Sequence, residues 1–264
     1  MKIAEESDGE IISCDSVQIY KGFDIGSAKP TKEEQKKIPH HLIDIISWNE
    51  DYDAGRYAIE AREAVSKVLA KNKTALVVGG SGLYLRSFLG EGWHANLPKD
   101  ETLRKELNQL SEEELFSRLQ KLDPIRAKEI HPNDKFRLVR AIELLTLLGK
   151  PVRDVEKENP WPKDWPTPHI KILDLPREHL HAAILKRTTA MLASGLIDEV
   201  KSLHEQGCPY TAKPMQTIGY RQVSKFLQGQ LKEENLENAI LFATRQYAKR
   251  QITWFKNVDR DRHL

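Results

Sequence analysis

The 264-residue chain contains only two cysteines, Cys14 and Cys208, and has no long apolar segment. So few cysteines exclude a disulfide-rich secreted scaffold and are typical of a reducing compartment. No apolar run approaches the roughly 20 residues that cross a membrane. Residues 1–20 also lack the basic start and apolar core of a signal peptide. We therefore expect a cytoplasmic protein with no membrane partner.

Internal repeats, low-complexity segments and metal-ligand spacings are missing as well. His40 and His41 are adjacent, so on a strand they would point to opposite faces and could not share an ion. His179 and His181 have no cysteine or carboxylate partner at ligand spacing. We expect no metal held by protein ligands, and in particular no zinc.

The composition is that of a soluble globular protein, with 30% charged and 39% hydrophobic residues. The length suggests one large domain or roughly two. The net charge of +2 is unevenly distributed, because residues 213–264 contain ten basic and five acidic residues (10 − 5 = +5). A basic carboxyl-terminal quarter suits an anionic partner, either a nucleic acid or a diphosphate.

The first 95 residues alternate strand-like and helical patterns. The expected elements are the tail of a helix at 3–6, a buried strand around Ile11–Ile12, a strand at 41–46, a helix at 57–69, a buried strand at 74–78, and a helix that opens at 83 after the glycine turn 79–82. Strand, glycine turn and helix in this order indicate a parallel sheet with helical crossovers.

From about residue 96 to 167 the strand patterns disappear. Ser111 and Glu114 predict a capping box, and a second helix is expected at 136–148, closed by Gly149. After a proline-rich loop at 159–168, the remaining elements are expected to be a strand at 170–175 and helices at about 177–206 and 235–256. We therefore predict an α/β core in two parts, 1–95 and 168–264, interrupted by an all-helical insertion at 96–167.

Two candidate sites follow predicted strands. Asp15 comes directly after the first strand, at the sheet end where α/β proteins bind ligands. Its carboxylate is either a general base or an acceptor for backbone N–H groups of the next turn. The glycine turn 79–82 either binds an anion on its backbone amides or simply presents Ser81 as a helix cap.

Two further pairs of residues each allow two interpretations. Arg137 and Arg140 lie about one helical turn apart, as a solvated pair or as ligands for phosphate. Trp161 and Trp165 either stack on bases or cover the joint between the insertion and the core.

The last predicted helix carries a basic stripe. Arg245, Lys249 and Lys256 share one face, whereas Tyr247 and Trp254 pack elsewhere. Acidic residues that would pair along this stripe are missing, which favours an anion-binding face over a merely solvated one.

Seven segments together resemble the tRNA dimethylallyltransferase family. In chain order they are Asp15-Ser16-Val17-Gln18-Ile19-Tyr20, Gly26-Ser27-Ala28-Lys29-Pro30, Pro39-His40-His41-Leu42-Ile43-Asp44, Gly79-Gly80-Ser81-Gly82-Leu83-Tyr84, Asn133-Asp134-Lys135-Phe136-Arg137-Leu138-Val139-Arg140-Ala141, Gly219-Tyr220-Arg221-Gln222 and the last-helix run 245–251. Each motif alone is modestly specific, but seven in register over essentially the whole chain are highly specific.

The resemblance implies a prenyl transfer. Family members attach the dimethylallyl group of dimethylallyl diphosphate to N6 of the adenosine just 3′ of the anticodon (tRNA position 37), in tRNAs that read codons beginning with U. Asp15 matches the general base, which helps because the N6 lone pair is delocalised into the ring. Ser81 stands where most members have Thr, and Arg221 matches a residue that binds the leaving diphosphate. Mg²⁺ is the implied cofactor.

The resemblance also implies a set of tRNA contacts, made by a monomer. The matching positions are Asp15, Ser16, Val17, Gln18, Arg104, Phe136, Arg137, Leu138, Val139, Arg140, Ile218, Gly219, Tyr220, Arg221 and Gln222. Phe136 departs from the usual Gln, which puts that base contact in doubt. The target adenosine is expected to flip out of the anticodon stack into a channel, and the helical insertion to help hold the anticodon loop.

The amino terminus departs from the family pattern. Members have a P-loop NTPase-like fold that begins with a strand, a phosphate-binding loop of the Gly-Pro-Thr-x-Ser-Gly-Lys-Thr type and a helix. Residues 1–8 match only the end of that helix, so we expect this fold with its first strand and loop absent. Either the native start lies upstream, or the chain is a truncated tRNA-binding protein with impaired catalysis.

A third interpretation is a nucleotide or nucleoside kinase of the P-loop superfamily. The missing phosphate loop and the tRNA-type motifs in the insertion rank it last. The insertion also favours tRNA over a free adenylate as the prenyl acceptor.

Overall fold

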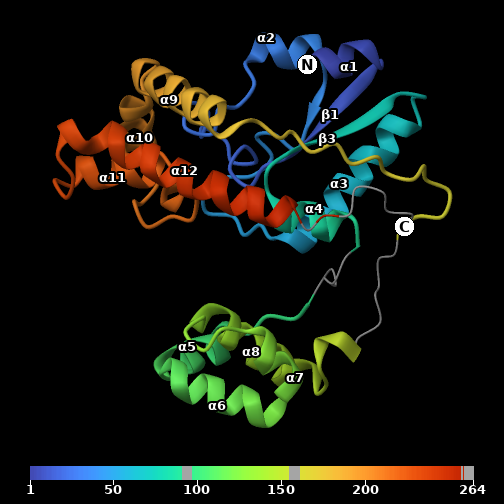
Figure 1. Ribbon diagram of the computed structural model, residues 1–264, viewed down its shortest axis with the longest axis vertical. Helices are drawn as coiled ribbons and strands as arrows, with labels where there is room; N and C mark the ends of the chain where they lie inside the picture. The colour runs from blue at the N-terminus through green and yellow to red at the C-terminus, as the bar shows by residue number, and fades with distance from the viewer. Residues whose placement is uncertain (91–96, 155–160, 257, 259–264) are drawn as a thin grey trace. The chain divides into compact units, whose positions relative to one another are not determined.

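The computed structural model describes residues 1–90, 97–154, 161–256 and 258. The expected boundary at 95–96, the start of the proline-rich loop at 159–160 and the charged residues at 259–262 lie outside the described residues. Contacts divide the chain into two compact units (Figure 1). Unit 1 comprises Met1–Phe88 and Trp161–Leu264, and unit 2 comprises Leu89–Pro160.

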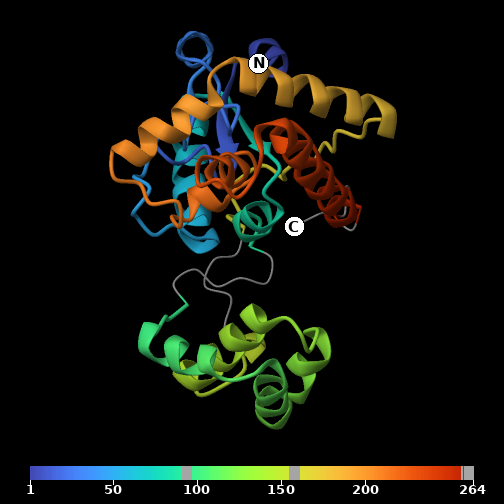
Figure 2. The same ribbon diagram turned by 90° about the vertical axis from the view of Figure 1, so that its left-hand side faces the viewer.

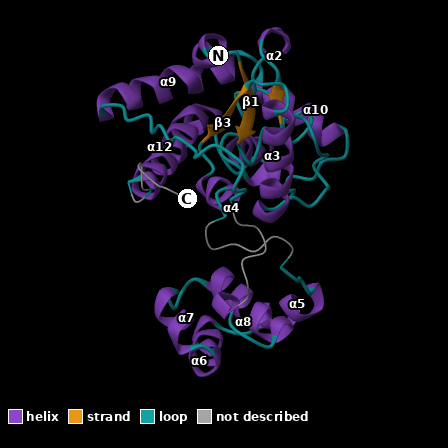
Figure 3. Ribbon diagram, turned by 90° about the vertical axis from the view of Figure 1, so that its right-hand side faces the viewer, coloured by secondary structure: helices purple, strands orange, loops and turns teal. Residues whose placement is uncertain are grey.

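Unit 1 is built on a parallel sheet of three strands (Figure 3). The central strand β1, Gly9–Cys14, pairs with β2, His40–His41, on one side and with β3, Thr74–Gly79, on the other. All six residues of β1 are buried, as the apolar run predicts. The parallel sheet and its helical connections confirm the α/β class.

The second expected strand is much shorter than predicted. Residues 41–46 do not stay extended, because Leu42 and Asp44 adopt left-handed conformations with φ of 61° and 57°. The chain therefore turns away from β1 after His41, and Ile46 keeps only an isolated bridge to Tyr20. The apolar pattern of residues 41–46 correctly indicates that Ile46 is buried, but it contains no signal for the left-handed turns at Leu42 and Asp44.

Two other strand predictions also need correction. β3 forms, but it is not fully buried, because Val78 is 54% exposed and β3 pairs only with β1. Residues 170–175 form no strand at all, and Leu173 is 83% exposed. A strand requires a neighbour for its backbone groups, and within the described residues neither β3's outer edge nor residues 170–175 have one.

Helices surround the sheet of unit 1. They are α1 (Lys2–Glu6), α2 (Lys32–Lys37), α3 (Ala54–Leu69), α4 (Gly82–Phe88), α9 (Arg177–Ala193), α10 (Leu196–Glu205), α11 (Tyr220–Leu227) and α12 (Leu236–Phe255), with short 3-10 turns at Val152–Asp154 (in unit 2), Pro214–Gln216 and Glu233–Asn235. The helix expected at 177–206 is broken, because Gly195 has a φ of 95°. α9 and α12 pack side by side (Figure 2). Among the described residues, no helix is both long and apolar enough to span a bilayer.

Unit 2 is helical throughout its described residues. Its helices are α5 (Glu101–Gln109), α6 (Glu112–Leu122), α7 (Pro124–Glu129) and α8 (Lys135–Leu148). The predicted capping box forms, with the Ser111 hydroxyl accepting from the N–H of Glu114. α8 ends at Gly149, whose φ of 66° is the left-handed cap expected there. Leu107, Leu119 and Leu138 lie in the core of this unit.

Candidate functional site

Asp15 lies at the carboxyl end of β1 and shapes the turn that follows. Its Oδ1 accepts hydrogen bonds from the backbone N–H groups of Val17 at 2.7 Å and Gln18 at 3.2 Å. This confirms the turn-forming interpretation without excluding the catalytic one. Within the described part of the chain, Oδ2 of Asp15 has no hydrogen-bond partner, so one carboxylate oxygen remains to accept a proton.

Ser81 joins this turn from the end of β3. Its Oγ accepts a hydrogen bond from the backbone N–H of Ser16 at 3.1 Å, and its own N–H donates to the carbonyl of Cys14 at 3.2 Å. Asp15 and Ser81, 66 positions apart in the sequence, are therefore neighbours because β1 and β3 pair up to Cys14 and Gly79.

The glycines of the turn 79–82 are explained by close packing. A Cβ on Gly79 would lie 2.1 Å from the carbonyl oxygen of Cys14, and one on Gly82 would lie 2.6 Å from the Trp254 ring of α12. The carbonyl of Gly80 accepts hydrogen bonds from Tyr247 at 3.3 Å and from Gln251 at 3.0 Å. The turn 79–82 is therefore a packing surface for α12. Anion binding by the backbone amides of the turn stays a prediction.

Replacing Gly82 with alanine is expected to destabilise the protein by roughly 1–3 kcal/mol, because the new methyl group overlaps Trp254. The penalty should shrink in the double variant with Trp254→Phe, whose smaller ring leaves space, and urea unfolding of the four proteins measures this coupling. Equal penalties in both backgrounds would mean that Trp254 is not the obstacle.

Burial keeps the other titratable groups near Asp15 neutral. It raises the pKa of the Cys14 thiol to about 12, so this cysteine is not a nucleophile at neutral pH. Burial, reinforced by the negative charge of Asp15, also raises the pKa of Tyr247. The Tyr247 hydroxyl therefore stays a hydrogen-bond donor at the edge of the site.

Gln18 is engaged within the protein. Its Oε1 accepts from the Ser13 hydroxyl at 3.0 Å, and its Nε2 donates to the carbonyls of Ser27 and Ala28, both at 3.3 Å. The side chain thereby ties the Asp15 turn to the segment 26–30. Ser16 and Val17, by contrast, are respectively exposed and half-buried beside it.

The segment 218–222 exposes one charged side chain. Tyr220 is buried, and its hydroxyl donates to Glu199 at 2.6 Å. Gln222 is also buried, and its Oε1 accepts from the N–H of Gly219 at 2.9 Å. Ile218 is half-buried, whereas Arg221 is exposed and has no ion pair among the described residues.

Glu199 is a supporting residue that the sequence analysis missed. Its carboxylate accepts from Tyr220 and from the backbone N–H groups of Asp24 and Ile25, the latter at 2.8 Å. It therefore fixes both the loop that carries segment 26–30 and the start of α11. Nothing in the sequence around Glu199 distinguishes it from other acidic residues at the start of a helix.

The basic stripe of α12 is exposed. Arg245, Lys249 and Lys256 all reach solvent, and none has an ion pair within the described residues. Tyr247 and Trp254 turn toward the glycine turn instead, as the helical spacing predicts. This unpaired charge supports the hypothesis of an anion-binding face.

In unit 2, Arg104 and Arg140 converge on Glu143. The carboxylate of Glu143 is fully buried, with Oε1 2.9 Å from Nε of Arg104 and Oε2 2.5 Å from Nη1 of Arg140. Glu143 also accepts from the N–H of Asp100 at 2.8 Å. The sequence analysis missed this acid, because it stands inside the apolar run of a helix.

The other candidates in α8 divide between surface and core. Phe136 is 83% exposed, and Arg137 is exposed with Nε 3.2 Å from the Asp134 carboxylate. Leu138 and Val139 are buried, so their side chains pack in the core of unit 2 and are not available to contact RNA directly.

Trp161 and Trp165 pack within unit 1. The ring of Trp161 meets Phe88 at 5.4 Å and Trp165 at 5.3 Å between centroids, in edge-to-face contacts. Arg62 lies over the Trp161 ring and donates two hydrogen bonds to the carbonyl of Phe88. The cluster holds together the two points where the chain leaves and re-enters unit 1, so these rings pack within the fold of unit 1, and their stacking on bases stays a prediction.

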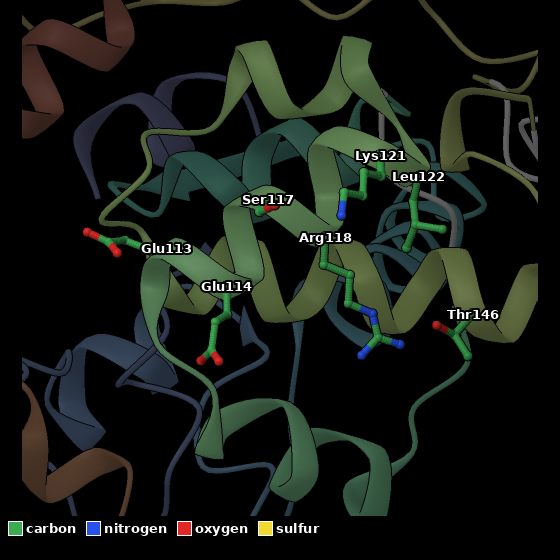
Figure 4. Close-up of a pocket in the computed structure, with 7 residues that line it drawn as sticks. All are labelled: Glu113, Glu114, Ser117, Arg118, Lys121, Leu122 and Thr146. Carbon is green, nitrogen blue, oxygen red and sulfur yellow. The ribbon is translucent and has the colours of Figure 1, made fainter.

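A shallow hollow of about 610 Å³ lies on unit 2, between α6 and α8 (Figure 4). It is lined by Glu113, Glu114, Ser117, Arg118, Lys121, Leu122 and Thr146. None of the predicted site residues lines it, and its open, charged walls are typical of a solvated surface.

His40 and His41 already have protein partners. His41 lies 2.8 Å from the buried Glu10 carboxylate, and His40 lies 2.7 Å from the carbonyl of Ile38. In the portion of the chain that the structure describes, no group of three or more His, Cys, Asp or Glu residues could hold a metal ion.

Comparison with known proteins identifies clear relatives. The family model for IPP transferase matches residues 18–258. A tRNA dimethylallyltransferase from Syntrophobacter fumaroxidans is 41% identical, over 97% of this chain and 76% of that protein. A tRNA dimethylallyltransferase 1 from Trichlorobacter lovleyi is 40% identical, over 97% of this chain and 85% of that protein.

Solved structures agree with these relatives. A tRNA isopentenylpyrophosphate transferase from Bacillus halodurans superposes with a TM-score of 0.66 and 32% identity, covering 98% of this chain and 82% of that one. A eukaryotic dimethylallyltransferase acting on tRNA superposes with a TM-score of 0.75 and 26% identity, covering 96% and 65%.

Proposed function

The chain belongs to the IPP transferase family, and we propose that it transfers a dimethylallyl group from dimethylallyl diphosphate to N6 of an adenosine in tRNA. The adenosine is the one just 3′ of the anticodon, in tRNAs that read codons beginning with U. The observation that carries the proposal is Asp15, whose turn is held by Ser81 and whose Oδ2 has no hydrogen-bond partner among the described residues.

In the proposed reaction, N6 attacks the allylic C1 of the donor as the bond from C1 to the diphosphate oxygen breaks. Asp15 takes the N6 proton, which keeps electron density on an otherwise poor nucleophile. The diphosphate leaves with the bonding electron pair. The exposed guanidinium of Arg221, which has no ion pair among the described residues, is suited to its negative charge.

The unpaired cations support an RNA substrate. Arg245, Lys249 and Lys256 on α12 present positive charge suited to a phosphate backbone. On unit 2, Arg137 is exposed although it pairs with Asp134, whereas Arg104 and Arg140 are engaged by the buried Glu143 and offer little free charge. With tRNA as the substrate, we propose that the protein works in the cytoplasm.

Mg²⁺ is proposed as a companion of the diphosphate. The described residues do not fit a dedicated metal site, because they contain no cluster of three or more ligands. Mg²⁺ commonly binds substrate phosphates and water with few protein ligands, so it would arrive with the donor and neutralise part of its charge. No step of the transfer by this chain's residues depends on it.

A second candidate is a tRNA-binding protein with impaired transfer. The observation behind it is that, among the described residues, the outer edge of β3 has no paired strand. The family match and the tRNA transferases among the relatives count against the kinase interpretation.

The deciding experiment measures transfer from labelled dimethylallyl diphosphate to an unmodified anticodon stem-loop with Mg²⁺. This chain is compared with a version extended at its amino terminus by the family's strand and phosphate loop. We expect transfer at least in the extended version, and none to a stem-loop with inosine at the target position, because inosine lacks the N6 amine. No transfer by either version, with RNA still bound, would favour the binding protein.

A further inference from the structure

Glu199 joins three segments of unit 1 through one half-buried carboxylate. Its Oε1 accepts a hydrogen bond from the Tyr220 hydroxyl at 2.6 Å and from the N–H of Gly26 at 3.4 Å. Its Oε2 accepts from the N–H groups of Asp24 at 3.2 Å and Ile25 at 2.8 Å. Glu199 lies in the first turn of α10, while its donors come from one loop and from the first residue of α11. A single side chain therefore holds two segments that are remote in the sequence.

Close packing around Tyr220 leaves these segments little room to move. The Tyr220 side chain is fully buried, and its ring lies 4.9 Å from that of Phe23 between centroids. A Cβ on Gly26 would lie 2.5 Å from the Tyr220 ring, so a side chain there would force the ring to move. Burial, reinforced by the negative charge of Glu199, raises the pKa of Tyr220, which keeps its hydroxyl protonated as a donor.

The loop that Glu199 holds also supports the turn of the proposed base, Asp15. Nε2 of Gln18 donates to the carbonyls of Ser27 and Ala28, both at 3.3 Å, directly after the N–H groups that bind Glu199. The N–H of Gln18 in turn donates to Oδ1 of Asp15 at 3.2 Å. Hydrogen bonds and short stretches of backbone therefore connect Glu199 to Asp15.

On its other side, Glu199 holds the neighbour of Arg221. Tyr220 directly precedes Arg221, the exposed side chain proposed to bind the leaving diphosphate. The N–H of Arg221 donates to the carbonyl of Thr217 at 2.9 Å, so its backbone belongs to the ordered start of α11. The position from which the guanidinium extends is therefore fixed through Tyr220.

We infer that Glu199 is a positioning residue, which sets the distance between the proposed base, Asp15, and the proposed diphosphate ligand, Arg221. The inference rests on the proposed function and adds to it a residue that touches neither substrate. During transfer, N6 and the leaving diphosphate lie on either side of the allylic carbon, so the groups that serve them must keep their separation. A displacement of about 1 Å in such an arrangement can lower a rate about 10²-fold.

The test measures single-turnover transfer to the anticodon stem-loop, with the version of the protein that is active. Glu199→Ala should lower the rate constant about 10–100-fold and raise the half-saturating donor concentration about tenfold, because both groups lose their support. Glu199→Gln should keep most of the activity. Its amide oxygen can accept from the loop, while its Nε2 donates to the Tyr220 oxygen.

The matched control is Asp198→Ala. Asp198 is the adjacent acid in the same helical turn, its side chain is 82% exposed, and it lies 3.5 Å from the Lys201 ammonium. An exposed pair of this kind contributes little to stability. Asp198→Ala should therefore transfer at the rate of the unsubstituted protein.

Two further readouts separate positioning from a merely structural role. Loss of folded protein would lower the amplitude of the single turnover, whereas misplaced groups lower the rate constant at full amplitude. In an Arg221→Ala background, Tyr220→Phe should not raise the half-saturating donor concentration further, because Arg221 is the group it positions. Glu199→Ala should still lower the rate constant in that background, because it also releases the loop that supports Asp15.

Equal rate constants in Glu199→Ala and Asp198→Ala, or a loss confined to the amplitude, would overturn the inference while leaving the proposed function intact. If the unsubstituted protein transfers no dimethylallyl group in either version, the proposed function fails, and the inference fails with it.

Discussion

Asp15→Asn is expected to lower the rate of dimethylallyl transfer by about 10²–10⁴-fold while the protein stays folded. The asparagine Oδ1 can still accept the N–H groups of Val17 and Gln18, so the turn after β1 survives. Only the capacity to take the N6 proton is lost. Single-turnover transfer to the stem-loop, measured with the version of the protein that is active, gives the rate.

The comparison with Asp15→Ala separates the two roles of the carboxylate. Alanine removes both the base and the turn acceptor, so it should add a loss of stability that Asp15→Asn does not show. Transfer by Asp15→Asn at the unsubstituted rate would mean that Asp15 only shapes the turn, and a different base would have to be sought.

Glu143→Gln is expected to destabilise unit 2 by about 3–5 kcal/mol, because it removes one partner of a buried ionic network. Arg104 and Arg140 would both lose the carboxylate that now lies within 2.9 Å of them. Hydrogen exchange of peptides from α5 and α8 in the full chain should rise, whereas exchange in β1 should not change.

The matched control for this variant is Glu129→Gln. Glu129 pairs with Arg126 at 2.6 Å on the surface, where both side chains are about half exposed. An exposed pair contributes less than about 1 kcal/mol, so this variant should behave like the unsubstituted chain. Equal exchange in the two variants would show that the buried network does not hold α5 on α8.

The same carboxylate predicts a pH dependence. Burial raises the pKa of Glu143, but the hydrogen bonds from Asp100, Arg140 and Arg104 outweigh burial and keep the pKa below its ordinary 4.5. A carboxyl group whose pKa is lower in the folded state than in the unfolded state stabilises the protein at any pH above its unfolded-state pKa. This stabilisation is lost as the pH falls through the folded-state pKa. Below about pH 4.5, unit 2 should therefore lose stability more steeply in the unsubstituted chain than in Glu143→Gln.

The sequence by itself determined the elements whose signals are local. The capping box of Ser111 and Glu114 and the left-handed Gly149 mark helix ends through bonds that span a few residues. The apolar run at Ile11–Ile12 forms the central strand, and Asp15 follows it as predicted. The motifs also pointed to the family, because seven of them occur in register along one chain.

Only the tertiary structure decided the features that depend on distant partners. Residues 170–175 have a strand pattern but pair with no strand in the described part of the chain, and the pattern of 41–46 is overridden by turns at Leu42 and Asp44. The glycines of the turn 79–82 are explained by contacts with Cys14, earlier in the chain, and with Gln251 and Trp254 of α12, about 170 residues later. Contacts between residues that are remote in the sequence cannot be predicted from local patterns, because each segment taken alone is compatible with several conformations.

Two acidic residues that support the candidate sites, Glu199 and Glu143, could not be identified from the sequence for the same reason. Glu199 and Glu143 resemble ordinary helical acids in the sequence, yet each gathers three or more donors from separate segments in the fold. Phe136 illustrates the converse, because an apolar residue in a helix is expected in the core and here faces solvent. Residue types and their spacing were enough to predict the kind of reaction. The burial and the hydrogen-bond partners of each side chain decide what that side chain can do, and both exist only once the chain is folded.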